Sequence, residues 1–160
     1  VNDPLPKGLI GLERASPEQV EMWRLRKGLP IGPGEINGQM NPFELGLSNL
    51  VNLDKGCYLG QETVAKLSKL GSVKQQLRYW YADEFVDGGS KLISPCLSAE
   101  KENNIGLITS AFYNKKTGIS FGLAMVRRKW LQESELFLED GNKKVFLEDF
   151  LGFNSQNGMT

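Results

Sequence analysis

The hydrophobic and polar positions follow two different periods in the two parts of the chain. Up to about residue 71 the apolar residues are spaced as in short helices separated by loops. After Gly71 apolar and polar residues alternate, so that odd positions from Val73 to Tyr81 share one face of a predicted strand. The even positions from Lys74 to Trp80 form its other face. The pattern therefore predicts an α+β chain, with a mixed α/β piece at 1–71 followed by a β domain.

Capping signals mark the first helix. Ser16 is an N-cap residue, Pro17 occupies the first helical position, and Gln19 completes a capping box with Ser16. Gly28 is placed to end the helix as a C-cap in the left-handed conformation. We expect a helix that begins after Ser16 and ends at Gly28.

The rest of the first piece alternates between loops and short elements. Residues 29–40 hold five Gly and Pro residues and predict a loop. Asn41 and Glu44 repeat the capping logic at the start of a short helix. Residues 50–53 predict a strand, and residues 61–70 predict a second helix that ends at Gly71. So few elements bury little surface, and we expect 1–71 to belong to a larger domain or to pack on the β domain.

The second piece contains several short strands separated by hairpin signals. Such spacing is typical of a small antiparallel barrel, which we predict for 72–153, followed by a polar, frayed tail at 154–160. After the strand at 73–81, the expected strands are 105–113, 119–127, 136–139 and 144–148.

Composition removes several classes of function. Lys plus Arg and Asp plus Glu both number 19, which disfavours direct nonspecific binding of nucleic acid. The absence of histidine disfavours a zinc site or a serine-hydrolase triad, and no metal ligands are predicted. No stretch approaches the roughly 20 apolar residues of a membrane span. Without a secretory signal we expect a cytoplasmic protein with Cys57 and Cys96 as free thiols, and an organelle matrix or stroma stays open.

One short run carries candidate chemistry. Residues 55–62 read KGCYLGQE and place Cys57 between two glycines, just before the helix predicted to start at Gln61. A helix N-terminus favours nearby negative charge, so this position and Lys55 would stabilise a thiolate. The alternative is that Cys57 is a small, buried apolar residue, as many free cysteines are.

The same run resembles a known family. KGCYLGQE matches the Lys-Gly-Cys-(Tyr or Phe)-x-Gly-Gln-Glu signature of YgfZ-type proteins, the folate-binding relatives of glycine-cleavage T-protein (GcvT superfamily). The family's other segments have counterparts in the same order, namely NPFELGL at 41–47, GLITSA at 106–111 and AMVRR at 124–128.

This resemblance implies a fold and a function. The fold would be the C-terminal part of a GcvT-like folate-binding region, followed by a barrel. The cofactor would be tetrahydrofolate, and the partners would be iron–sulfur enzymes whose clusters are assembled or repaired. By the same resemblance, Cys57 is the functional thiol, and Lys55, Tyr58, Gln61 and Glu62 are its supporting and cofactor-binding residues.

One position departs from the family pattern, and other functions stay open. Relatives carry a glutamate where this chain has Arg26, and a guanidinium can only donate hydrogen bonds to a pterin. The first alternative is a folate-dependent aminomethyltransferase or demethylase of the T-protein type. A second is an interaction module in which Cys57 is inert. Two cysteines exclude a fixed four-cysteine cluster, whereas a cluster shared with a partner stays open.

Overall fold

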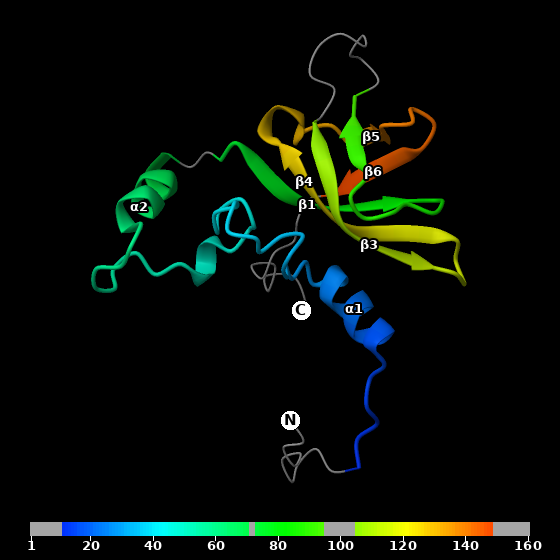
Figure 1. Ribbon diagram of the computed structural model, residues 1–160, viewed down its shortest axis with the longest axis horizontal. Helices are drawn as coiled ribbons and strands as arrows, with labels where there is room; N and C mark the ends of the chain where they lie inside the picture. Colours follow the sequence, from blue (N-terminus) through cyan, green and yellow to red (C-terminus); the bar gives the residue numbers. More distant parts are fainter. Residues whose placement is uncertain (1–10, 71–72, 95–104, 149–160) are drawn as a thin grey trace, which may run out of the picture.

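The computed structural model describes residues 11–70, 73–94 and 105–148. Two helices precede six strands, and single 3-10 turns follow residue 47 and strand β4 (Figure 1). None of the helices in these ranges is long and apolar enough to cross a membrane. The elements are α1 (Pro17–Arg26), α2 (Gln61–Leu70), β1 (Gln75–Ala82), β2 (Lys91–Ile93), β3 (Gly106–Asn114), β4 (Ile119–Arg127), β5 (Glu135–Leu138) and β6 (Lys144–Glu148).

The six strands form a closed antiparallel barrel in the order β1-β4-β3-β2-β5-β6. Closure comes from β1, which pairs with β4 on one side and with β6 on the other. The barrel interior is apolar and includes Trp80, Leu92, Ile108, Val126 and Leu136, all buried. The predicted α+β fold with a small antiparallel barrel is therefore confirmed.

The N-terminal arm, which we define as residues 11–60, packs part of its length against the outside of this barrel. Leu25 of α1 and Leu45 of the following turn join Leu77, Leu123 and Met125 in a second apolar cluster on the outer face of β1 and β4. Figure 1 shows α1 beneath the barrel, while α2 lies at the far end of the arm. The alternation in β1 thus serves two cores, because Leu77 faces the arm and Trp80 faces the barrel interior.

The first helix has the predicted ends. The Ser16 amide donates to Gln19 Oε1 (2.7 Å) and the Gln19 amide donates to Ser16 Oγ (3.1 Å), which completes the capping box. Gly28 has φ 64°. The Gly28 amide donates to the Leu25 carbonyl, and the Leu29 amide donates to the Arg24 carbonyl. This is a Schellman motif, in which a left-handed residue satisfies the last carbonyls of the helix.

The second capping box forms, but the helix expected after it does not. The Glu44 amide donates to Asn41 Oδ1 (3.1 Å), and the Asn41 amide donates to Glu44 Oε2 (3.2 Å). Only one turn follows, because the chain reverses at Gly46, whose φ is 72°. The predicted short helix is therefore absent, although the predicted capping box is present.

Two strand predictions fail for related reasons. Residues 50–53 form no strand; Leu50 is exposed, and Asn52 Oδ1 accepts from the Asp54 and Lys55 amides in a local turn. This apolar run has no neighbouring strand to pair with, so the local hydrogen bonds prevail. Conversely, β2 was not predicted, because three residues are too few to show an alternating pattern. Cys96, the helix end at Gly71 and the tail at 154–160 lie outside the described residues.

A bulge in β3 brings its backbone unusually close to β4. The register shifts between Ile108 and Ser110, so Thr109 is the extra residue. A Cβ atom on Gly122 would overlap the Ser110 carbonyl. Only glycine fits there without displacing a strand.

We therefore expect Gly122→Ala to lower the free energy of unfolding by about 1–3 kcal/mol, the usual cost of overpacking. Urea denaturation measures this change. Gly88→Ala is the matched control, because a Cβ at Gly88 meets nothing within 4 Å. Equal stability of the two variants would contradict the close approach of β3 and β4.

Candidate functional site

The KGCYLGQE segment forms a loop that leads into α2. Cys57 is exposed in this loop, so the interpretation of Cys57 as a small buried residue is wrong. Of the two bracketing glycines, only Gly60 needs a left-handed conformation (φ 86°), and it makes the turn into the helix. The loop therefore presents a solvent-accessible thiol four residues before the first residue of α2.

Lys55 lies next to Tyr58 in this loop. Its ammonium nitrogen is 5.1 Å from the centre of the Tyr58 ring, in cation–π geometry. Within the described residues Lys55 makes no hydrogen bond to the Cys57 thiol, so the predicted stabilisation of a thiolate stays a prediction.

Among the described residues of the KGCYLGQE segment, the Tyr58 hydroxyl is the one buried side-chain atom that lacks a hydrogen-bond partner. It is shielded from solvent and has no hydrogen-bond partner. A buried hydroxyl without a partner costs about 1–3 kcal/mol. No described contact tests the cofactor-binding role predicted for Tyr58, which stays a prediction.

The last two motif residues begin α2. The Gln61 side chain donates to the Leu53 carbonyl (3.4 Å), and the Gln61 amide donates to the Tyr58 carbonyl (3.2 Å). Glu62 is exposed in the first turn, where a carboxylate is stabilised by the positive end of the helix dipole. The structure thus brings Lys55, Tyr58 and Gln61 together, whereas Glu62 faces solvent, as Cys57 does.

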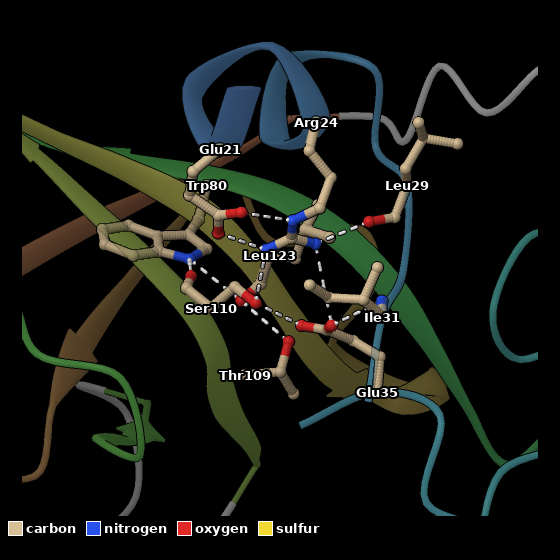
Figure 2. Close-up of polar contacts among 9 residues, drawn as sticks. All are labelled: Glu21, Arg24, Leu29, Ile31, Glu35, Trp80, Thr109, Ser110 and Leu123. Atoms are coloured by element: carbon tan, nitrogen blue, oxygen red, sulfur yellow. Dashed lines mark hydrogen bonds and ion pairs between the residues drawn. The ribbon is translucent and has the colours of Figure 1, made fainter. Parts of the chain in front are cut away.

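A second polar site, which sequence patterns did not reveal, joins the arm to the barrel (Figure 2). Arg24 of α1 is nearly buried and forms a two-pronged ion pair with Glu21, at 2.8 and 2.6 Å. Its other contacts are to the Leu29 carbonyl (2.5 Å) and to Ser110 Oγ in the β3 bulge (3.0 Å). The Glu21 carboxylate raises the pKa of Arg24, and Arg24 lowers the pKa of Glu21.

Glu35 completes this network from the Gly- and Pro-rich loop. Only 1% of its surface is exposed, and its carboxylate accepts from the Ser110 hydroxyl (2.6 Å) and from the Ile31 amide (3.0 Å). It also lies 3.8 Å from an Arg24 nitrogen. On the barrel side, the Trp80 indole donates to the Ser110 and Leu123 carbonyls (Figure 2). The network therefore fixes α1 and the loop after it against the bulge of β3.

One part of this network lies in a segment that the sequence analysis singles out. Residues 106–111 are the GLITSA segment, and the hydroxyl of Ser110 in this segment links Arg24 to Glu35. Glu35 itself lies in a loop, where no periodic pattern distinguishes a buried acid from an exposed one.

Arg26, the residue that departs from the family pattern, lies against the outside of the barrel. Its guanidinium carbon is 5.8 Å from the centre of the Phe121 ring, which packs beside Tyr79 and Phe112. Burial and the nearby Glu148 raise the pKa of Tyr79, and Arg26 acts in the opposite direction. Arg26 is therefore placed on an aromatic surface and offers only donors there.

The described residues contain no group of three or more His, Cys, Asp or Glu side chains that would hold a metal ion.

Comparisons with known proteins place these features in context. No family model matches the chain. It is 31% identical over 109 residues to a chloroplastic protein of Arabidopsis thaliana named as a transferase, and these residues are 68% of this chain and 24% of the relative. It is 32% identical over 103 residues to an aminomethyltransferase of Moorella thermoacetica, covering 64% of this chain and 27% of the relative.

Two further similarities concern the motif and the fold. The tRNA-modifying protein YgfZ of Colwellia psychrerythraea is 41% identical over 61 residues, which are 35% of this chain and 19% of that protein. The crystal structure of the glycine cleavage system aminomethyltransferase T from Bartonella henselae superposes with a TM-score of 0.67 at 19% identity, over 88% of this chain and 39% of that one. The chain thus spans about a quarter of the length of its first curated relative. By sequence and by fold, it is homologous to part of the aminomethyltransferase (GcvT) superfamily.

Proposed function

We propose that the chain works as part of a tetrahydrofolate-binding factor that supports the assembly or repair of iron–sulfur clusters in client enzymes, with Cys57 as its functional thiol. The observation that carries this proposal is the exposed Cys57 in a complete KGCYLGQE segment at the start of α2. The 61 residues that match a YgfZ protein support the narrower assignment. A thiol that is open to solvent is accessible to a client protein without a change in the fold.

The motif residues offer suitable contacts for a folate. The unpartnered Tyr58 hydroxyl would donate to or accept from the ligand, and the Lys55 ammonium would donate to its oxygens. Bound tetrahydrofolate would supply a carrier for one-carbon groups. Arg26 offers no acceptor for the N–H groups of a pterin, so the ring must find its acceptors on other residues.

The surface of the arm supports the proposal that 1–71 belongs to a larger α/β domain. Large apolar side chains are exposed along it much more often than on the barrel, where only Phe85 and Leu107 are exposed among those described. Frequent exposure of large apolar side chains along one segment is consistent with a surface that another part of a protein covers. The exposed residues of the arm are Leu12, Val20, Trp23, Ile31, Ile36, Leu50 and Leu59.

A folate-dependent aminomethyltransferase is the second candidate. The similarity to the Moorella aminomethyltransferase favours it, although it extends over only 27% of that enzyme. This candidate assigns no task to the Cys57 thiol, because a positioned acid or base transfers the protons in such a reaction. The two proposals therefore make opposite predictions for Cys57.

We expect Cys57→Ala to abolish function in cells. The full-length gene would be placed in cells that lack their own YgfZ-type protein, and thiomethylation of tRNA by an iron–sulfur enzyme would be measured. The wild type should restore this activity, whereas Cys57→Ala should leave it at the level of cells without the gene. Thr63→Ala is the matched control, since Thr63 is an exposed polar residue of α2 just outside the KGCYLGQE segment.

Other outcomes would reject one part of the proposal or the whole. If Cys57→Ala restores thiomethylation as well as Thr63→Ala does, Cys57 is not the functional thiol. If the soluble wild type fails to restore it, and the purified protein transfers an aminomethyl group to tetrahydrofolate, the second candidate replaces the first.

A further inference from the structure

A groove of about 330 Å³ lies where the C-terminal half of α2 approaches the end of the barrel. Its volume is at the lower end of the range for small-molecule sites, which begins near 300 Å³. Elements far apart in the sequence form its walls, namely the turn after Asn41, α2, the start of β1 and the 3-10 turn after β4. Apolar and polar side chains share the lining, among them Phe43, Leu67, Leu131, Ser68, Gln76 and Arg128.

The charge of the groove is one-sided. Arg128 is its one charged lining residue, and no carboxylate lines it among the residues described. The Arg128 side chain makes no hydrogen bond or ion pair within the part of the chain that the structure describes. Its backbone is held in place, because the Arg128 amide donates to the Lys74 carbonyl (2.9 Å). An unpaired guanidinium beside neutral polar groups favours an anionic group.

The apolar walls restrict the anion further. Phe43, Leu67 and Leu131 offer no partner to a small hydrated ion, but they match the faces of a ring. We propose that this groove binds an aromatic ring that carries a carboxylate, directly or through a short linker, with the ring between α2 and the barrel and the carboxylate on Arg128. The p-aminobenzoylglutamate half of a folate has this chemistry, as does a free aromatic acid, and in naming the folate the inference rests on the proposed function.

The position of the groove on α2 agrees with this identification. Leu67 follows Gln61 by six residues, which is about 9 Å along a helix axis. The groove and the KGCYLGQE loop therefore lie along one helix, and an elongated ligand would span the distance between them.

The test is isothermal titration of the protein with p-aminobenzoylglutamate. The wild type should bind it, and Arg128→Gln should raise the Kd at least about tenfold, since a charge-assisted hydrogen bond is lost. Lys129→Gln is the matched control. It removes the same charge from the next residue, whose ammonium lies over the Trp130 ring and does not line the groove. This control should bind as the wild type does.

A second variant tests the groove itself. Ser68→Leu adds a larger side chain to a helix that tolerates leucine, and it should raise the Kd by filling the space where the ring lies. Thermal unfolding of each variant would show that α2 and the barrel remain folded.

Two further probes identify the source of the ligand. p-Aminobenzamide has the ring without a carboxylate and should bind at least about tenfold more weakly than p-aminobenzoylglutamate. Binding of benzoate as tight as that of p-aminobenzoylglutamate would support the groove and assign it to a free aromatic acid. Equal affinity of wild type and Arg128→Gln, or no binding of any carboxylate, would overturn the proposal. Neither result would alter the outcome of the Cys57→Ala test, so the two failures are distinguishable.

Discussion

Replacement of Trp80 by alanine should lower the free energy of unfolding by about 3–5 kcal/mol, the usual cost of removing a large aromatic side chain from a core. Trp80 has no exposed surface and fills the barrel interior. Its indole nitrogen also donates to two backbone carbonyls, Ser110 (3.2 Å) and Leu123 (3.1 Å), on neighbouring strands. Alanine would leave a cavity and two carbonyls without this donor. Urea denaturation followed by circular dichroism measures the loss.

Two controls separate the contributions to this effect. Trp80→Phe retains a ring and removes the donor, so it should cost less than alanine and report the hydrogen bonds. Trp23→Ala removes the same side chain from an exposed position (55%) and should change stability by less than about 0.5 kcal/mol. If Trp80→Ala is no more destabilising than Trp23→Ala, the barrel interior is not packed around Trp80.

Arg24→Leu is expected to have an effect of similar size, about 3–5 kcal/mol, because it leaves the Glu35 carboxylate buried without its cation. Glu35 would keep its hydrogen bonds to the Ser110 hydroxyl and the Ile31 amide, which offset only part of this cost. The free energy of unfolding, measured by urea denaturation, gives the size of the loss.

The neighbouring arginine provides the control. Arg26→Leu removes an exposed charge and should be nearly neutral for stability. A double variant, Arg24→Leu with Glu35→Leu, should recover part of the loss, since no buried charge then remains unpaired. If Arg24→Leu were as stable as Arg26→Leu, the network would not hold the arm on the barrel.

The ion pair between Arg24 and Glu21 predicts that stability depends on pH. Arg24 lowers the pKa of Glu21, so the pair stabilises the fold above the ordinary carboxyl pKa, near about 4, and this contribution disappears as the pH falls through the lowered value. The stability difference between wild type and Arg24→Leu should therefore shrink in acid. The part of this decrease that comes from Glu21 should be small, because solvent reaches the Glu21 side chain.

Local rules sufficed for those elements that are stabilised within a short stretch of chain. The capping boxes at Ser16 and Asn41, the left-handed Gly28 and the alternation along β1 all depend on residues close in sequence, and all were predicted. The hairpin of β3 and β4 was predicted from the loop residues between them, and the barrel was predicted from the spacing of several short strands.

The remainder depends on residues distant in sequence. Strand β2 exists because β3 and β5 hold it on both sides, and residues 50–53 are not a strand because no neighbour does so. Glu35 lies 75 positions from the serine hydroxyl that contacts it. No local pattern records such a pair, since burial of an acid depends on what the rest of the fold brings beside it.

The candidate site shows the same division. The start of α2 at Gln61 was predicted from the sequence, whereas the exposure of Cys57 was not, because a buried thiol had stayed open as the alternative. The unpartnered hydroxyl of Tyr58 and the placement of Lys55 over its ring depend on side-chain conformations that residue spacing does not define.

Because β1 pairs with both β4 and β6, each of the six described strands has a partner strand on both sides for at least part of its length. A partner protein that added a strand of its own would find no whole strand edge to pair with through backbone hydrogen bonds. Under the proposed function, selectivity for a client enzyme would then come mainly from side chains on the barrel surface and the arm, and it could change by point substitution while the β-sheet stays the same.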